Sequence, residues 1–384
     1  MGSGTAEQRE HYWDTLRAFA MLLGIPYHTA MAYRPNDTWI VRADEGAAVL
    51  AALAEFIHLF RMPAFFVIAG YFAAMLLARR EPGAWLKGRT VRLGIPFVTT
   101  IVTLVPLMNL ACEFSNLPYS AALSSFMKNS AASGGYWVRH LWFIIVLLYC
   151  CGIAALLASR FPALRRQILP DRLDRAVARH FTLALLGTAT VLGLWQGAAI
   201  EAFYILGLNT NLPQQILRLD EMIIYAPWFT LGFLLHRMPL TLARFGRIDA
   251  GAVALAAAAT VLAMTLRHEL HPAAGRFIAT FAALTLTQIL VAVTRTFFDR
   301  PSALVRQVTD ASFVIYLFHM PIIIWLVWLA QGIAVPVEVK ATAIMALSFA
   351  LSWAAWAVIA RSPSLSSRFN GISHPPPSRQ SAPA

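Results

Sequence analysis

Residues 12–33 read YWDTLRAFAMLLGIPYHTAMAY, an apolar segment that carries Arg17 and His28 well inside it. Positions eleven apart fall on nearly the same face of a helix, about three turns or roughly 16 Å along its axis. An ionisable residue within a membrane span is costly to bury and marks a functional position by default. The segment therefore predicts a membrane helix with one face along a polar path.

The composition places the chain among membrane proteins. Of its 384 residues, 58% are hydrophobic and 13% are charged, whereas soluble domains carry about 25% charged residues. Apolar stretches of about 20 residues recur along most of the chain, and that is the length a bilayer-spanning helix needs. We therefore expect an all-α, polytopic integral membrane protein in contact with the lipid bilayer.

The apolar stretches predict about ten transmembrane helices within one domain, residues 1–361. A Pro- and Ser-rich tail, residues 362–384, is expected to be disordered and cytoplasmic. The ten expected spans are residues 13–33, 49–78, 92–112, 138–158, 181–200, 221–236, 248–266, 274–296, 312–330 and 340–360.

The net charge of +12 does not indicate a nucleic-acid partner. The basic residues form no stripe interleaved with aromatic side chains and match no nucleic-acid motif. They gather in alternate connections, namely residues 79–92, 159–180, 236–248 and 295–311 and the tail after 360. By the positive-inside rule these connections face the cytoplasm, so both termini are expected there.

The sequence offers no signature of a metal or a permanently bound cofactor. Cys112, Cys150 and Cys151 lie in apolar segments, without the spacing of a disulfide framework or a zinc site. Buried free cysteines usually behave as small hydrophobes. The chain also lacks a Gly-rich phosphate loop and a nucleophile elbow.

His28 is the first candidate for chemistry. Pro26 removes a backbone donor and predicts a kink beside it. With the N-terminal end inside, His28 lies roughly 22 Å from that end and therefore toward the outer face. A neutral imidazole there can act as a general base toward a hydroxyl. A structural histidine hydrogen-bonded between helices fits the same pattern.

The second predicted span carries Glu55, His58 and Arg61 along one stripe, because residues three apart are neighbours on a helix. By helical rise, Glu55 and His58 lie near the depth of His28. We predict Glu55 as the carboxylate that orients the catalytic histidine. The alternative is an internal ion pair of Glu55 with Arg61 or His58.

Arg89 and Arg92 stand one turn apart at the cytoplasmic mouth of the third span. Two arginines in this arrangement can fork onto phosphate oxygens and hold the nucleotide end of an acyl carrier. Juxtamembrane arginines also set topology and contact anionic lipid, which is the alternative.

Polar and aromatic residues recur toward the outer side and within a late span. His140 and Trp142 open the fourth span, where aromatic residues also form interfacial belts. His319 lies mid-span beside Pro321 and has a packing role as its alternative. The outer loop 201–221 combines aromatic and polar residues that suit a carbohydrate, as many exposed loops do.

These residues occur in ordered landmarks over roughly residues 8–360. The landmarks are Gln8-Arg-Glu10, Leu16-Arg-Ala18, Leu23-Gly-Ile-Pro-Tyr-His28, Phe56-Ile-His-Leu-Phe-Arg-Met62, Phe65-Phe-Val-Ile-Ala-Gly-Tyr-Phe72, Arg89-Thr-Val-Arg-Leu-Gly-Ile-Pro96, His140-Leu-Trp-Phe143 and Ala311-Ser-Phe-Val-Ile-Tyr-Leu-Phe-His319. In this order and spacing the chain resembles the acyltransferase 3 family of integral-membrane O-acyltransferases.

The resemblance implies roles for several residues. The family's Arg-x10-His motif corresponds to Arg17 and His28, and its cytoplasmic acyl-CoA-binding Arg-x-x-Arg motif corresponds to Arg89 and Arg92. Its Phe-Phe-x-x-Ser-Gly motif corresponds to residues 65–70, with Ala in place of Ser at position 69. That departure argues against a required hydroxyl and leaves a close-packing role for Gly70.

Within the family, the chain looks most like the membrane succinyltransferases that act on osmoregulated periplasmic glucans, cyclic ones included. The resemblance implies a multi-pass protein of the bacterial inner membrane, with cytoplasmic succinyl-CoA or acetyl-CoA as donor and a periplasmic glucan as acceptor. The residues expected at the site are, for catalysis, His28, Glu55 and Arg17, and, for substrate binding, His58, Arg61, His140, Trp142 and His319.

Arg61 is expected to pair with the free carboxylate of the succinyl group, because a buried carboxylate needs a cationic partner. At roughly 16 Å along one helix, Arg17 and His28 are not expected to touch. Arg17 is expected to contact the carrier or to pair with Asp14. Alternatives are O-acetylation of another envelope polysaccharide and, from another class, a proton-coupled transporter. Direct transfer, an acyl-histidine intermediate and homo-oligomers all stay open.

Overall fold

The computed structural model describes residues 11–35, 39–41, 43, 45–132, 134–165, 169–208 and 216–372. Within these ranges every regular element is a helix. The long helices are α3 (Ala48–Leu77), α4 (Pro82–Asn116), α7 (Trp142–Arg160), α9 (Phe181–Ile200), α11 (Leu219–Arg237), α13 (Ala250–Leu266), α14 (Pro272–Phe298), α15 (Ala303–Leu329) and α16 (Val337–Ala360).

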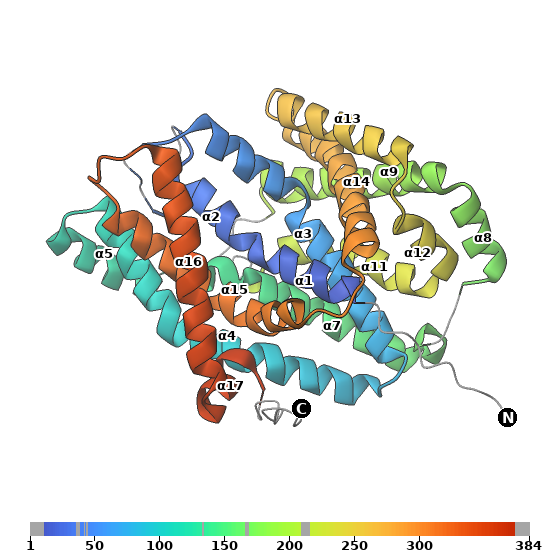
Figure 1. The fold of residues 1–384 in the computed structure, drawn as a ribbon, viewed down its shortest axis with the longest axis horizontal. Coiled ribbons are helices and arrows are strands. Elements are labelled where there is room, and N and C mark those ends of the chain that lie inside the picture. Colours follow the sequence, from blue (N-terminus) through green and yellow to red (C-terminus); the bar gives the residue numbers. More distant parts are fainter. Residues whose placement is uncertain are drawn as a thin grey trace, which may run out of the picture.

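Short helical elements connect and cover the long ones. They are α1 (Tyr12–Leu22), α2 (Gly24–Ala32), α5 (Tyr119–Ala132), α6 (Gly134–Val138), η1 (Arg139–Leu141), η2 (Pro162–Arg165), α8 (Asp171–Arg179), η3 (Glu201–Ile205), α12 (Pro239–Phe245) and α17 (Pro363–Asn370). Figure 1 shows α1 and α3 in the middle of the molecule, α5 at one end, α8 at the other and α13 along the upper edge.

The prediction of an all-helical polytopic membrane protein is confirmed for the described residues. Each of the ten expected spans falls on a helix or on consecutive helices. Seven helices are long and apolar enough to cross a membrane, or up to eight if α12 and α13, bent by 66°, form one span. Because α1 and α2 are short and α11 is not among the seven, the count of ten stays a prediction. The cytoplasmic location of both termini also stays a prediction.

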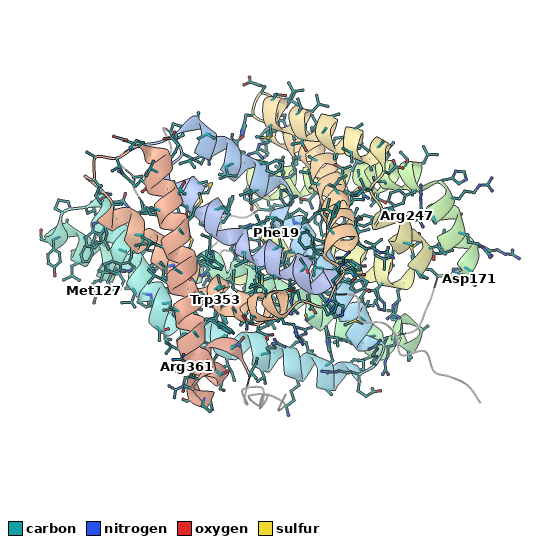
Figure 2. All side chains as sticks on the ribbon, viewed as in Figure 1. Phe19, Met127, Asp171, Arg247, Trp353 and Arg361 are labelled. Atoms are coloured by element: carbon teal, nitrogen blue, oxygen red, sulfur yellow. The ribbon has the colours of Figure 1, made fainter. Side chains whose placement is uncertain are left out.

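Burial separates central helices from peripheral ones. The apolar window of α3 is 61% buried inside the protein, whereas that of α16 is only 22% buried. Large apolar side chains stand on the outer surface, among them Phe19, 42% exposed, and Met127, 63% exposed (Figure 2). An extended apolar surface of this kind is typical of contact with lipid or another apolar partner. α3 therefore forms the centre of the bundle and α16 its rim.

The first predicted span is a broken helix, and Pro26 explains the break. α1 ends at Leu22 and α2 begins at Gly24. Pro26 has no N–H to bond the carbonyl of Leu22, so the helical ladder cannot pass this point unchanged. The helix breaks where the kink was predicted, and the break lies between Arg17 on α1 and His28 on α2.

Two carboxylates hold the starts of helices that lie elsewhere in the chain, and of the two Asp174 is buried and Asp299 is exposed. Asp299 accepts hydrogen bonds from the backbone N–H groups of His11, at 2.8 Å, and Tyr12, at 3.2 Å. Asp174 accepts from the N–H groups of Leu240, at 2.9 Å, and Thr241, at 2.8 Å. The first turn of a helix leaves N–H groups without helical partners, and these side chains satisfy them.

α3 and α11 pack backbone against backbone at two glycines. A Cβ atom built on Gly70 of α3 would collide with the backbone of Phe229, and one built on Gly232 of α11 would collide with the backbone of Val67. Small residues permit this approach between membrane helices. The close-packing role predicted for Gly70 is therefore confirmed.

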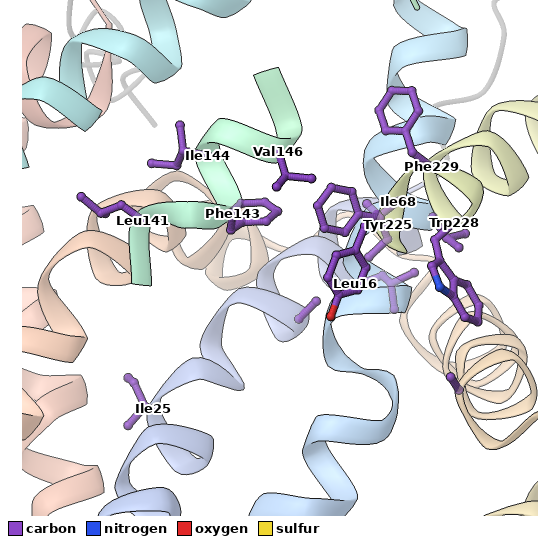
Figure 3. Close-up of a cluster of buried hydrophobic side chains, with 14 of the residues drawn as sticks. Leu16, Ile25, Ile68, Leu141, Phe143, Ile144, Val146, Tyr225, Trp228 and Phe229 are labelled. Atoms are coloured by element: carbon purple, nitrogen blue, oxygen red, sulfur yellow. The ribbon is translucent and has the colours of Figure 1, made fainter. Parts of the chain in front are cut away.

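The aromatic core spreads from this contact toward α7. The ring of Phe66 lies 4.9 Å from that of Tyr225, with the two rings stacked, and 5.5 Å from that of Phe143. Figure 3 shows Phe143 and Tyr225 in one cluster with Leu16 and Ile68. The cluster joins α1, α3, α7 and α11 into one packed body.

The prediction of a disordered tail from residue 362 is wrong for residues 363–370, which form α17. The Ser362 hydroxyl caps this helix by accepting from the Leu365 N–H, at 3.4 Å, and Gly371 ends it with a φ of 63°. Gly371 packs against the backbone of Arg92, and a side chain at this position would collide with it. Residues 373–384 lie outside the described part of the chain.

Gly70→Ala is expected to destabilise the protein by about 1–3 kcal/mol or more, because the added methyl group forces α3 and α11 apart. The measurement is the melting temperature in detergent. Gly187→Ala in α9 is the matched control, since its Cβ would meet no atom within 4 Å. Equal melting temperatures for both variants and the parent would contradict this packing.

Candidate active site

Three histidines from three separate elements meet at the centre of the bundle. His28 lies on α2, His140 on η1 and His319 on α15. The ring centroids of His28 and His319 are 5.4 Å apart, and those of His140 and His319 are 5.9 Å apart. His140 and His319 are buried, at 7% and 2% exposure. The sequence predicted each residue singly, and the fold brings the three together.

The hydrogen bonds of His319 fix its tautomer. Its Nδ1 lies 2.8 Å from the Tyr316 carbonyl and 3.1 Å from the Ile315 carbonyl. Carbonyl oxygens only accept, so Nδ1 donates and Nε2 holds the lone pair. Nε2 is buried and has no hydrogen-bond partner among the described residues. It faces Gly24, where a Cβ would stand 2.8 Å from it.

Aromatic rings hold His28 on two sides. The Trp39 ring stacks on it at 5.5 Å between centroids, and the Tyr27 ring meets it edge-on at 4.8 Å. Its Nδ1 is buried without a hydrogen-bond partner among the described residues. The ring is thus oriented by packing, and a ring nitrogen is left for a further group.

A strained backbone positions His140. The preceding residue, Arg139, has a φ of 44°, a left-handed conformation that is uncommon for a residue with a side chain. Its Nε donates to Asn109 Oδ1 at 2.7 Å, and its guanidinium lies 4.6 Å from the centre of the Tyr136 ring. The Tyr316 hydroxyl donates to the His140 carbonyl at 2.7 Å. Such strain persists where the surroundings impose it, as they do at many functional sites.

Arg61 and His58 both pack against Tyr27. The Arg61 guanidinium lies 4.2 Å from the centre of the Tyr27 ring, a cation–π contact. The Tyr27 hydroxyl and His58 Nδ1 are 3.3 Å apart. No carboxylate among the described residues lies within ion-pair distance of Arg61. Its positive charge is therefore available to a ligand.

Two cavities meet at His28. A small cavity of ≈ 60 Å³ contains the three histidines, and a larger one of ≈ 500 Å³ extends from it toward η3 and the start of α14. Both are lined by His28, Arg61, Met62 and Trp142. The larger cavity adds the aromatic rings of Tyr27, Tyr204 and Tyr225.

A third cavity, of ≈ 70 Å³, borders the histidine cavity. Arg17 and Arg89 line it, and it shares Phe65 with the histidine cavity. The Arg89 guanidinium lies 5.9 Å from the centre of the Trp85 ring. The three cavities therefore follow one another, from the two arginines past Phe65 to the histidines and on to the large cavity.

The predicted relations of Arg17 hold. Its guanidinium is 3.7 Å from the Asp14 carboxylate, the ion pair that the sequence suggested. Arg17 and His28 line different cavities, in agreement with the separation expected from helical rise. Arg92, one turn beyond Arg89, is exposed and does not line the Arg17 cavity.

The structure does not place Glu55 beside His28, so the orienting role predicted for it is not retained. Glu55 lies 3.2 Å from His268, 3.9 Å from Arg34 and 4.0 Å from Arg267. These partners come from segments far along the chain, which helical spacing within one span cannot reveal. The alternative pairing of Glu55 with Arg61 or His58 is not found either.

The segment 201–221 supplies residues to the large cavity from both sides of residues 209–215, which the structure does not describe. The Tyr204 hydroxyl donates to Asp220 at 2.8 Å, and Arg218 bonds Glu221 at 2.6 Å. Tyr204 and Glu221 line the large cavity. Asn209 and Asn211, also considered for carbohydrate contact, lie outside the described residues.

Sequence reasoning missed Arg276 and Trp39. Arg276 lies within the predicted span 274–296 and lines the large cavity, so the rule applied to Arg17 and Arg61 could have found it. Trp39 stands in a connection and gave no such signal. Within the described residues, no three His, Cys, Asp or Glu side chains are placed to hold a metal ion.

Comparisons with known proteins identify relatives of this chain. A family model described as an acyltransferase domain matches residues 10–357. The chain is 30% identical over 330 residues to glucans biosynthesis protein C of Escherichia coli strain K12 and to the protein of that name in Shigella dysenteriae serotype 1. The match covers 82% of each chain. No solved structure matches the chain.

Gly24→Ala is expected to lower the melting temperature, because the new methyl group displaces the His319 ring from its carbonyl partners. The same substitution in a His319→Ala background is expected to be neutral, since the smaller side chain leaves room. A double-mutant cycle measured by thermal unfolding checks this. Equal destabilisation by Gly24→Ala in both backgrounds would contradict the contact.

Proposed function

The chain belongs to the acyltransferase family whose domain model spans residues 10–357, and on that premise we propose that it succinylates glucan hydroxyls. The donor is cytoplasmic succinyl-CoA, and the acceptor is a glucan on the periplasmic side of the bacterial inner membrane. The observation that carries the proposal is the series of cavities with His28 at its central junction. It offers separate places for donor and acceptor.

The donor enters from the side of Arg17 and Arg89. Both arginines line one cavity, and guanidinium groups bind phosphate oxygens with paired hydrogen bonds. The Trp85 ring beside Arg89 adds an aromatic surface at the same place. The pantetheine arm then passes Phe65, which borders both this cavity and the histidine cavity. Because these two cavities are small, side chains must move to admit the arm.

The acceptor occupies the ≈ 500 Å³ cavity. Its wall combines the rings of Tyr27, Trp142, Tyr204 and Tyr225 with a few polar groups, as small-molecule sites do. Aromatic side chains offer an apolar face together with a polar tip, which suits the alternating surfaces of a sugar. The name of the matched relatives, which concerns glucan biosynthesis, supports a glucan as the acceptor class.

The chemistry takes place where the cavities meet, at His28. A ring nitrogen of His28 accepts the proton of the acceptor hydroxyl while the hydroxyl oxygen attacks the thioester carbonyl carbon. The carbon–sulfur bond then breaks, and the proton passes to the sulfur of coenzyme A. An ester and free coenzyme A result, with no net proton released.

His319 supports this step from the other side of the histidine cavity. Its Nδ1 is held by carbonyls, and its Nε2 lone pair lies in a ring 5.4 Å from that of His28. The arrangement favours a histidine that stays neutral and ready to share a proton. His140, fixed by the strained backbone at Arg139, closes the same cavity.

Arg61 selects the acyl group. It lines both the histidine cavity and the acceptor cavity, and it has no carboxylate partner among the described residues. The free carboxylate of a succinyl group on the thioester requires a cation in a site of this kind. Arg61 is the arginine that lines the histidine cavity, and it lies on the same helix stripe as His58.

His28→Gln is expected to lower glucan-dependent release of coenzyme A from succinyl-CoA by about 100-fold or more, because a general base is lost. The assay uses purified protein in detergent with added glucan. His180→Gln is the control, since His180 is exposed and lines none of these cavities. A His28→Gln enzyme with parental turnover would exclude the proposed role.

Arg61→Leu is expected to reduce kcat/KM for succinyl-CoA about ten-fold more than kcat/KM for acetyl-CoA, because only the succinyl group carries a second carboxylate. Steady-state kinetics with both donors measure this ratio. Full retention of succinyl transfer, or an equal loss with both donors, would remove Arg61 from acyl-group selection.

A further inference from the structure

Arg276 stands where two outer cavities adjoin. The acceptor cavity of ≈ 500 Å³ and a neighbouring cavity of ≈ 320 Å³ share four lining residues, namely His58, Ile200, Pro272 and Arg276. Arg276 does not line the histidine cavity or the Arg17 cavity. It therefore belongs to the acceptor side alone.

Glu221 and Glu55, the carboxylates beside these cavities, already pair with other residues. Glu221 receives a hydrogen bond from Arg218 at 2.6 Å. Glu55 is surrounded by His268, Arg34 and Arg267. Neither makes an ion pair with Arg276, and the Arg276 side chain makes no hydrogen bond or ion pair with any residue in the described ranges.

The backbone holds Arg276 at this place. The adjacent Gly275 packs so closely on the Arg267 backbone that a Cβ there would collide with the Arg267 carbonyl oxygen. Pro272 begins α14 and lines the same two cavities. Arg276 therefore lies in the first turns of α14, which pack against the backbone of Arg267 and form part of the cavity wall.

Two unpaired guanidinium groups consequently line the acceptor cavity, Arg276 and Arg61. Arg61 rests over the Tyr27 ring and also reaches the histidine cavity, where the acyl group is placed. Arg276 makes no such ring contact among the described residues, and Glu221, whose charge attracts it across the cavity, is bonded to Arg218. A partly buried cation is unfavourable unless an anion compensates it, and guanidinium groups bind carboxylates and phosphates strongly.

We propose that Arg276 recognises an anionic group on the acceptor, so that the preferred substrate is a glucan already bearing a carboxylate or phosphate ester. The inference rests on the proposed function and deepens it, because it defines the acceptor as a charged glucan. The aromatic wall holds the sugar rings while Arg276 fixes their position through the charged substituent. His28 then meets a hydroxyl of the same molecule.

The test compares two acceptors that differ only in charge. A neutral β-glucan oligosaccharide and its singly carboxymethylated form are assayed with the purified protein and succinyl-CoA. The parent is expected to show a KM about ten-fold lower for the charged form. Arg276→Gln is expected to raise that KM to the neutral value with kcat unchanged. Arg276→Lys retains the charge and is expected to keep much of the preference.

Acetyl-CoA and a second arginine serve as controls. If Arg276 binds the acceptor, the loss in Arg276→Gln is the same with acetyl-CoA as with succinyl-CoA. A loss confined to succinyl-CoA would overturn the proposal and assign Arg276 to the acyl carboxylate. Arg244→Gln, on α12 and away from both cavities, is expected to behave as the parent.

A binding measurement separates this inference from the proposed function. Microscale thermophoresis with the two oligosaccharides reports affinity without turnover. If no acceptor supports release of coenzyme A, the proposed function fails, yet tighter binding of the charged form that Arg276→Gln abolishes still supports the anion site. Equal affinity of the parent for both oligosaccharides overturns it, whatever the turnover.

Discussion

The approach of α3 to α11 at Gly70 and Gly232 is the constraint on which the site depends. Each glycine lies against the backbone of the opposite helix, so the separation of the two helices is set by main-chain contact and cannot adjust by side-chain movement. α3 carries Arg61 and Phe65, and α11 carries Tyr225, all of which line the cavities. The width of the acceptor cavity is therefore a property of the helix pair, since one added methyl group on either helix would widen it.

The broken first helix supplies the second constraint. The break at Leu23 leaves the end of α1 and the start of α2 beside the histidine cavity, which Ala20, Met21, Gly24 and His28 line. Arg17, about three turns from His28, lines the neighbouring cavity. The histidines sit between a cavity lined by two arginines and a larger one lined by aromatic rings. Such an order suits a reaction whose donor and acceptor are kept apart until the acyl group moves.

The sequence predicted the helices and most of the site, because apolar length and helical depth are local properties. It placed His28, His140, His319 and Arg61 as single candidates, and the fold gathers them in one cavity. The role predicted for Glu55 is not retained, because helical rise gives the depth of a residue and not its neighbours across the bundle. The partners of Glu55 are Arg34, Arg267 and His268, which lie on other segments. The prediction of disorder for residues 363–370 was wrong because it rested on Pro and Ser content alone. In the structure Ser362 caps a short helix and Gly371 packs on α4.

On the proposed function, the acyl group crosses the membrane through this series of cavities. Proteoliposomes offer the most direct measurement, with glucan enclosed in the lumen and radiolabelled succinyl-CoA added only outside. The account predicts labelled glucan inside vesicles that hold the parent protein, and none in those that hold His28→Gln. Labelled glucan that forms only when donor and acceptor share one compartment would contradict it.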